Sequence, residues 1–222
     1  MEKINKITLT EQVYLVLRND IIQQNIKCGE KLYLGTLQSR FNVSSSPIRE
    51  AMNRLYQDGL LEYYSNQGAI VIDLKKQDII EIYDFYLELE CTAIKFALKN
   101  VSYEQISEEL YENILLQEKS VDLEDSTYFK KVSDEFHIIF YNYANNSRLL
   151  SAVERIRGQF SILASKYQNF SETKHNVVKE HREIYEAIRN KDYEGTIYLM
   201  GKHFHNSKNY ILNNANALGL EI

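Results

Sequence analysis

Residues 36–59 read TLQSRFNVSSSPIREAMNRLYQDG, and their pattern predicts two short helices joined by a tight turn. Leu37 and Phe41 are four residues apart and share one face of the first helix, and Asn42 then interrupts that period with a residue that tolerates turn geometry. The second helix begins in a serine cluster beside Pro47, whose fixed φ suits a first helical turn. The pattern therefore predicts a helix-turn-helix.

The second of these helices has two chemically different faces. Its apolar face consists of Ile48, Ala51, Met52 and Leu55. The other face carries donors of the kind that reach phosphates and base edges when a helix enters the major groove. The candidate DNA-binding residues are Ser44, Ser45, Ser46, Arg49, Asn53 and Arg54. The alternative is that the helix-turn-helix geometry only serves packing, as in many small helical domains.

The segments on either side extend this unit. Residues 60–73, LLEYYSNQGAIVID, alternate well enough for two short strands joined by a turn at 65–68, which is a hairpin of the wing type. Residues 10–24 place Val13, Leu17 and Ile21 on one helical stripe. Together these patterns predict a winged helix-turn-helix over residues 8–73.

Length and composition indicate two domains, which we place at residues 1–74 and 75–222 of the 222-residue chain. Apolar residues make up 44% and no apolar run approaches the roughly 18 residues of a membrane helix, so we expect a cytoplasmic protein with no membrane partner. The two cysteines are expected to be free thiols.

Charge bears on the mode of DNA binding. The chain has a net charge of −5, and residues 1–73 hold eight Lys/Arg against eight Asp/Glu. Because nonspecific affinity grows with the number of phosphates neutralised, a near-neutral reading domain favours a homodimer that doubles the contacts.

Beyond residue 73 the period is helical. The expected helices are 76–99, 103–119, 125–144, 147–170, 172–190 and 192–214. The predicted fold class is therefore mainly α, an N-terminal winged helix-turn-helix with a small β-hairpin followed by an all-α bundle.

Histidine carries the chemical signal of this second domain. His137, His181 and His203 fall on separate predicted helices, each with an apolar stripe. Three imidazoles that converge in a bundle core can hold a divalent metal with open positions for water or a ligand. A lone histidine on an apolar stripe, however, is more often a packed core residue.

The run VSSSPIREAMNRLYQDGLLEYYSNQGAIV resembles the DNA-binding signature of the GntR family of bacterial transcription regulators. The resemblance implies that Arg49 contacts the operator and that Gly68 lets the wing approach the DNA backbone. Ser45 stands where the family commonly has arginine.

The contexts of the three histidines resemble those of the all-helical FCD domain in the FadR subfamily of that family. The resemblance implies a divalent ion (Zn, Ni, Mn or Fe), bound by one Asp and three His, that helps to hold a small carboxylate effector. Ser133 stands at the usual aspartate position, so Asp134 is the candidate fourth ligand. Tyr86 stands where an arginine is often found, and the candidate effector-binding residues are Tyr86, Arg155 and Arg157.

These observations favour a homodimeric, ligand-responsive transcription regulator, expected to be a repressor, that binds a palindromic operator and is not an enzyme. One alternative is a metal-dependent hydrolase or lyase that uses the three histidines, although no His-Glu-x-x-His motif supports it. Another is a metal-free regulator with an acyl-CoA-like effector.

Overall fold

The computed structural model describes residues 7–64, 68–168 and 170–220. The chain divides into two compact units, one of residues 1–74 with 154–162 and one of residues 75–153 with 163–222. In the described part of the chain, no helix combines the length and apolarity needed to cross a membrane.

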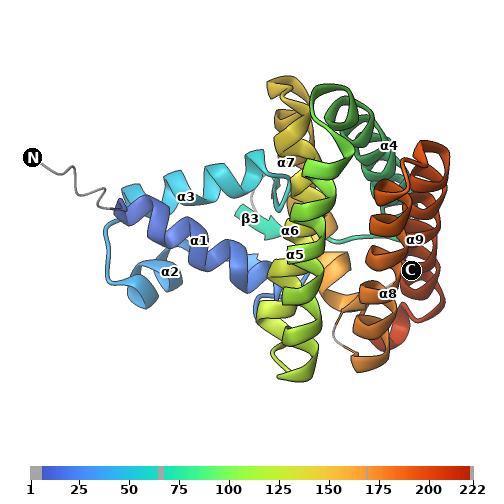
Figure 1. The fold of residues 1–222 in the computed structure, drawn as a ribbon. Coiled ribbons are helices and arrows are strands. Elements are labelled where there is room, and N and C mark those ends of the chain that lie inside the picture. Colours follow the sequence, from blue (N-terminus) through green and yellow to red (C-terminus); the bar gives the residue numbers. More distant parts are fainter. Residues whose placement is uncertain (1–6, 65–67, 169, 221–222) are drawn as a thin grey trace, which may run out of the picture. The chain divides into compact units, whose positions relative to one another are not determined.

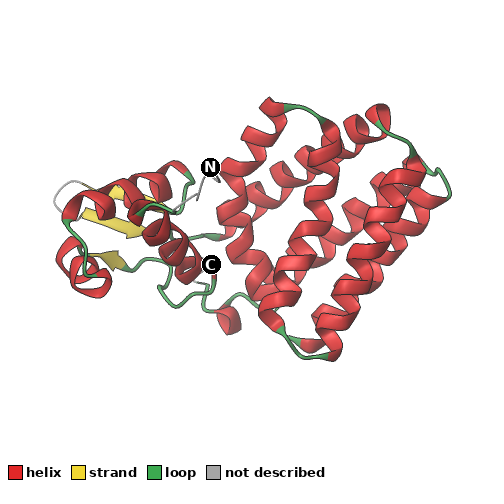
Figure 2. Ribbon diagram, turned by 60° about the vertical axis from the view of Figure 1, so that its left-hand side comes forward, coloured by secondary structure: helices red, strands yellow, loops and turns green. Residues whose placement is uncertain are grey.

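The first unit is a winged helix-turn-helix, as the sequence predicts. Its helices are α1 (Leu9–Ile22), α2 (Leu34–Phe41) and α3 (Ser45–Gln57), and its strands are β1 (Lys31–Leu32), β2 (Leu61–Tyr64) and β3 (Gly68–Val71). The strands form one antiparallel sheet in the order β1-β3-β2 (Figure 2). The strand β1 was not predicted, because a two-residue strand is too short to show alternation and exists only through its pairing with β3.

Of the two features predicted for the turn between α2 and α3, the asparagine at the turn is present and the serine capping bond is not. Asn42 ends α2 in the left-handed conformation with φ of 50°, which asparagine tolerates better than most residues. Ser44 occupies the N-cap of α3, but its side chain makes no capping hydrogen bond. The four residues predicted for the apolar face of α3 are all buried.

The wing is described only at its strands, since residues 65–67 of the predicted turn lie outside the described residues. Gly68 begins β3 with φ of +81°, a conformation that side chains with a Cβ rarely adopt. This position therefore requires glycine for its backbone.

The second unit is all helical. Its helices are α4 (Lys76–Asn100), α5 (Tyr103–Asp122), α6 (Ser126–Ala144), α7 (Ser147–Tyr167), α8 (Ser171–Arg189) and α9 (Tyr193–Asn213), followed by the short 3-10 helix η1 (Asn216–Leu218). Residues 154–162 of α7 cluster with the first unit. Side chains of Ser102, Asp125, Asn146 and Asp192 accept backbone N–H groups at the starts of α5, α6, α7 and α9, which explains where these helices begin.

Five helices of this unit form a closed ring. Contacts run from α4 to α6, from α6 to α5, from α5 to α8, from α8 to α9, and from α9 back to α4 (Figure 1). Apolar side chains fill much of the interior, among them the fully buried Phe136, Phe140 and Ile184. The polar side chains that share this interior are the candidate site.

Candidate metal centre and nucleic-acid interface

Each helix of the ring contributes a buried polar side chain to its interior. These side chains are Glu90 from α4, Gln117 from α5, His137 from α6, His181 from α8 and His203 from α9. Burying so many polar groups in one place is costly unless they are paired or bind a ligand. The ring interior is therefore built for a polar function.

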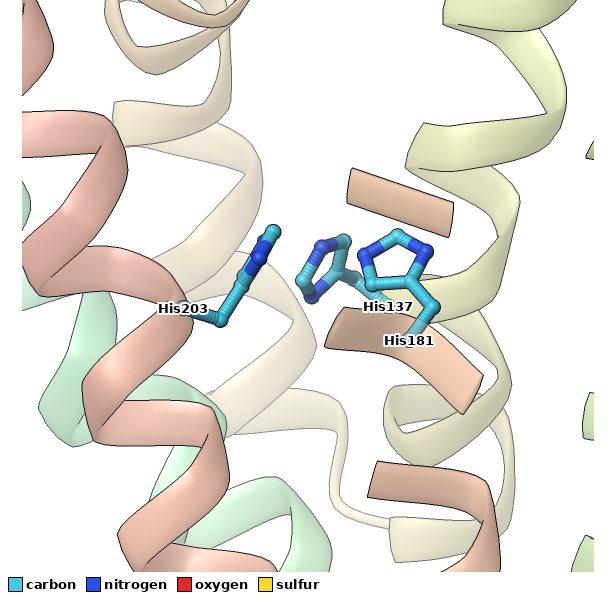
Figure 3. A group of neighbouring side chains, drawn as sticks. All are labelled: His137, His181 and His203. Atoms are coloured by element: carbon cyan, nitrogen blue, oxygen red, sulfur yellow. The ribbon is translucent and has the colours of Figure 1, made fainter. Parts of the chain in front are cut away.

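The three predicted histidines do converge. Their rings face one another from three different helices (Figure 3), and one nitrogen of each lies within 4.8 Å of the other two. Zn–N bonds of about 2.0–2.1 Å in a tetrahedral site place the ligand nitrogens roughly 3.4 Å apart. Small ring movements of about an ångström would thus suffice for all three to bind one ion.

A chain of hydrogen bonds fixes the tautomer of His181. The backbone carbonyl of Val132 can only accept, so Asn113 Nδ2 donates to it at 2.9 Å. Asn113 Oδ1 then accepts from Gln117 Nε2 at 2.7 Å, which leaves Gln117 Oε1 to accept from His181 Nδ1 at 2.9 Å. Consequently His181 Nδ1 carries the proton, and Nε2 presents a lone pair.

That lone pair has no partner. His181 Nε2 is buried without a hydrogen bond in the described part of the chain. An acceptor nitrogen held by a hydrogen bond on its other side, and pointing into a group of histidines, is the usual arrangement of a metal ligand. This observation shows that the residues fit a divalent ion.

A carboxylate orients His203 in the same way. Glu180 Oε2 accepts from His203 Nδ1 at 2.7 Å, and Glu180 Oε1 accepts from Asn206 Nδ2 at 2.6 Å. With Nδ1 protonated, His203 Nε2 is the nitrogen available to an ion. Both Glu180 oxygens are thus occupied by hydrogen bonds, so Glu180 lies next to the histidines without being a candidate metal ligand.

His137 faces the second buried carboxylate. Its Nδ1 lies 3.4 Å from Glu90 Oε2 but makes no hydrogen bond to it. Both Glu90 oxygens and the Tyr141 hydroxyl also lack hydrogen-bond partners among the described residues. Burial raises the pKa of Tyr141, and the neighbouring Glu90 raises it further. The phenol therefore stays protonated and can donate a hydrogen bond. This end of the site still has unused hydrogen-bonding capacity.

Burial favours the neutral form of two of the histidines. It lowers the pKa of His181 well below its usual value, and the neighbouring His203 and His137 lower it further. Burial also lowers the pKa of His203, against the opposing effect of its bond to Glu180. Because metal ligation needs unprotonated imidazole, these shifts suit His181 and His203 to binding an ion.

The fourth predicted ligand is not part of this group. Among the described residues, the cluster able to hold a metal comprises the three histidines and not Asp134. Three residues before His137, Asp134 is turned about 60° around the helix, toward partial exposure. Ser133, at the usual aspartate position, is buried and accepts a hydrogen bond from Gln168 Nε2 at 3.0 Å. The group thus consists of three imidazoles.

One predicted effector-binding residue lies beside the histidine group. Tyr86 is buried and its ring stacks on that of Phe204 at 5.8 Å, next to His203. Arg155 and Arg157 lie in the segment 154–162, which clusters with the first unit. Their role in effector binding stays a prediction.

On the first unit, most predicted DNA-binding side chains are accessible. Ser44, Ser46, Arg49 and Asn53 are exposed, and Ser45 is partly exposed. They lie on or beside the surface of α3 opposite its buried residues. Tyr63 from β2 approaches Asn53 with its hydroxyl, at 3.5 Å from Asn53 Oδ1. The strand of the wing thereby adjoins the helix face.

Arg54 has a different environment. Its guanidinium pairs with Glu11 and stacks 3.8 Å over the ring of Tyr14, whose hydroxyl donates to Asp58 at 2.6 Å. These contacts join α3 to α1. Arg54 is therefore a half-exposed link between two helices, and its role as a DNA contact stays a prediction.

Two known families match this chain. The FCD domain family matches residues 81–206, and the gntR family of bacterial regulatory proteins matches residues 9–71. The chain belongs to the GntR family. The gntR family consists of bacterial regulatory proteins, so this GntR protein is a transcription regulator and not the metal-dependent hydrolase or lyase of the alternative hypothesis.

Relatives extend over most of the chain. The uncharacterized HTH-type transcriptional regulator YdhC of Bacillus subtilis (strain 168) is 26% identical over 194 residues, which cover 87% of this chain and 86% of YdhC. The gluconate operon transcriptional repressor of the same strain is 26% identical, with 85% and 79% covered. The solved structure of E. coli McbR/YncC has a TM-score of 0.79 at 22% identity, with 95% and 100% covered, and shares the fold.

Sequence reasoning did not assign the residues that orient the histidines. Gln117 and Glu180 are buried on their helices, and an amide or charged side chain at a core position was the available signal. Their partners are distant in sequence, as in the 64-residue separation of Gln117 and His181. Only the packing of the ring identifies them.

Gln117→Leu tests this orienting role. The change is expected to weaken Zn²⁺ binding by about 10–100-fold, because His181 loses the acceptor that fixes its tautomer. Gln117→Glu keeps an acceptor and should retain most of the affinity, and Gln105→Leu on the exposed side of α5 should have no effect. Titration of the metal-free protein with Zn²⁺ measures this. Equal affinity of Gln117→Leu and the wild type would show that the relay does not orient a ligand.

Proposed function

We propose that this GntR protein is a homodimeric repressor that binds a palindromic operator through α3 and the wing, and that a small carboxylate effector bound in the helical unit releases it. The observation that carries the proposal is the pairing of two sites in one chain. One is a helix with buried apolar and exposed donor faces, and the other is a histidine group with an unpartnered ligand nitrogen. Operator binding would place the protein with the chromosome, in the cytoplasm.

Two features support a homodimer. The reading segment, residues 1–73, is electrically neutral, with eight basic and eight acidic residues, so that two copies would be needed for useful phosphate contact. The helical unit also exposes large apolar side chains that a second copy could cover, namely Phe85, Tyr111, Leu115, Leu116 and Leu123.

A divalent ion is part of the proposed effector site. His137, His181 and His203 would hold it, and when bound it supplies positive charge and an open position for an effector oxygen. Glu90 and Glu180 would balance its two positive charges from outside the ligand set, in place of the aspartate missing at Ser133. The name of the gluconate operon repressor supports a carboxylate effector.

Release of DNA would follow from a shift between dimer conformations. An effector that binds one conformation better than the other changes operator affinity by its differential affinity, typically ~1–3 kcal/mol. His137, His181 and His203 lie on three helices of the ring, so the bound effector would set the spacing of α6, α8 and α9. That spacing is the proposed bistable element.

Arg49→Ala tests the DNA-reading assignment. The change is expected to cost on the order of 1–3 kcal/mol of operator binding without unfolding the domain, because Arg49 is exposed on α3. Titration of a promoter fragment at fixed salt measures it, and Arg189→Ala removes the same charge from the exposed end of α8 as a control. A footprint should show two symmetric half-sites. Unchanged affinity of Arg49→Ala would reject α3 as the recognition helix.

A further inference from the structure

Glu90 of α4 is a buried carboxylate whose contacts leave its role open. The residue is fully buried, and both of its oxygens lack hydrogen-bond partners among the described residues. His137 Nδ1, which also makes no hydrogen bond there, lies 3.4 Å from Glu90 Oε2. Burying a carboxylate is unfavourable unless a donor or a cation is close to it. The contact with His137 is therefore the place to look for the role of Glu90.

The other two histidines show what an oxygen in this position does. Gln117 Oε1 accepts from His181 Nδ1 at 2.9 Å, and Glu180 Oε2 accepts from His203 Nδ1 at 2.7 Å. In both cases the oxygen lies at Nδ1, which leaves Nε2 for an ion. Glu90 Oε2 lies at the same ring nitrogen of the third histidine. Each histidine of the group thus has a side-chain oxygen beside its Nδ1.

This contact also decides which nitrogen of His137 carries the proton. A neutral imidazole has one N–H group and one lone pair, and a carboxylate only accepts hydrogen bonds. At 3.4 Å, a lone pair on Nδ1 would face the lone pairs of Glu90, which is repulsive, whereas an Nδ1–H group would face an acceptor. The favoured tautomer therefore has its proton on Nδ1 and its lone pair on Nε2.

The distance between His137 and Glu90 is close to that of a hydrogen bond. An N–H···O bond spans about 2.7–3.2 Å, so the two atoms are about half an ångström too far apart. The ligand nitrogens of the three histidines lie within 4.8 Å of one another and have to approach by about an ångström to share one ion. The movement that His137 needs to reach Glu90 is therefore smaller than the movement that metal binding requires.

Glu90 is separate from the ligand set. Among the described residues, the group that is compact enough to hold a metal comprises the three histidines and not Glu90. A carboxylate behind an imidazole fixes the orientation of the ring and makes it a more basic ligand. Glu90 comes from α4, which packs along α6, the helix of His137 (Figure 1). The contact thus joins α4 to the histidine group.

We propose that Glu90 is the positioning residue of His137: its carboxylate accepts from His137 Nδ1, so that His137 presents Nε2 to the ion. With this bond, all three histidines bind through the same nitrogen. The inference deepens the proposed function and rests on it only in taking the histidine group to bind an ion. It goes beyond charge balance, because a negative charge attracts an ion whatever its orientation, whereas an acceptor at Nδ1 selects one tautomer.

Titration of the metal-free full-length protein with Zn²⁺ tests this role. Glu90→Leu is expected to weaken Zn²⁺ binding by about 10–100-fold, the usual effect of losing an outer partner of a metal ligand. Glu90→Gln keeps an acceptor oxygen without the charge, and it should bind Zn²⁺ more tightly than Glu90→Leu. Glu88→Leu makes the same change at an exposed position of α4 and should bind like the wild type.

Nitrogen-15 NMR of the histidine rings provides a readout that a purely structural role would not move. In the metal-free wild type, His137 should carry its proton on Nδ1, and Zn²⁺ should then bind at Nε2. Glu90→Leu should give His137 a mixture of the two tautomers, whereas Glu90→Gln should keep the proton on Nδ1. His203 should keep its own tautomer in both variants, because its acceptor Glu180 is unchanged.

Three results would overturn the positioning role. They are a Zn²⁺ affinity of Glu90→Leu equal to that of the wild type, an affinity of Glu90→Gln as low as that of Glu90→Leu, and a wild-type His137 protonated on Nε2. Glu90→Gln has nearly the shape of the native residue, so its tautomer decides the matter even if Glu90→Leu misfolds. Failure of the metal proposal alone is distinguishable, because the wild type would then bind no Zn²⁺ while the His137 tautomer still depended on Glu90.

Discussion

Replacing His181 with alanine is expected to lower the affinity for Zn²⁺ or Ni²⁺ by about 100-fold or more. Loss of an outer partner of a metal ligand already costs about 10–100-fold, and loss of the ligand itself removes a bond as well. His181 is fully buried, its Nδ1 is held by Gln117, and its Nε2 has no partner among the described residues. It is therefore a histidine whose free nitrogen is held in place to bind an ion.

The measurement is elemental analysis after metal reconstitution, together with a Zn²⁺ titration. His175→Ala is the matched control, because His175 lies on the same helix, is exposed and bonds to the Ser171 carbonyl of its own helix. Operator binding without effector should stay near wild type in both variants, since the reading helix belongs to the other compact unit. Full ion binding by His181→Ala would show that the histidine group is structural.

Local patterns predicted much of the fold. The apolar face of α3 and the left-handed Asn42 follow from helical periodicity and turn chemistry, and both are present. The convergence of three histidines also followed, because each stands on an apolar stripe and such stripes face a common core.

What could not be predicted depends on pairings between distant segments. The relay from Val132 to His181 crosses three helices, and Lys174 of α8 donates to Ser126 at the start of α6. Residues 154–162 would show the same helical period in either unit. The sequence pattern therefore could not predict that they belong to the first unit. Asp134, three residues before His137, is turned about 60° from it around the helix, and its role as a ligand stays a prediction.

The site also depends on an apolar neighbour. Phe136 is fully buried, and its ring stacks on His181 with centroids 3.9 Å apart and planes 4° from parallel. It also makes edge contacts with His137 and Phe140. One side chain thus fills the core and sets the plane of the His181 ring.

Phe136→Ala is expected to destabilise the metal-free protein by about 3–5 kcal/mol. The change removes a buried phenyl group and leaves a cavity that the surrounding helices fill only in part. Urea unfolding followed by far-ultraviolet circular dichroism measures the free energy. Phe85→Ala, at a position 49% exposed on α4, removes the same atoms from the surface and should change stability far less.

The same variant separates packing from positioning. Without the stacked ring, His181 can tilt about its bond to Gln117, so Zn²⁺ affinity should fall in Phe136→Ala even at temperatures where the protein remains folded. Phe136→Leu refills most of the volume without a flat surface, and it should recover stability more fully than metal affinity. If both variants lose less than about 1 kcal/mol and bind Zn²⁺ normally, His181 is held by its hydrogen bond alone, and the stacking contributes to neither stability nor the site.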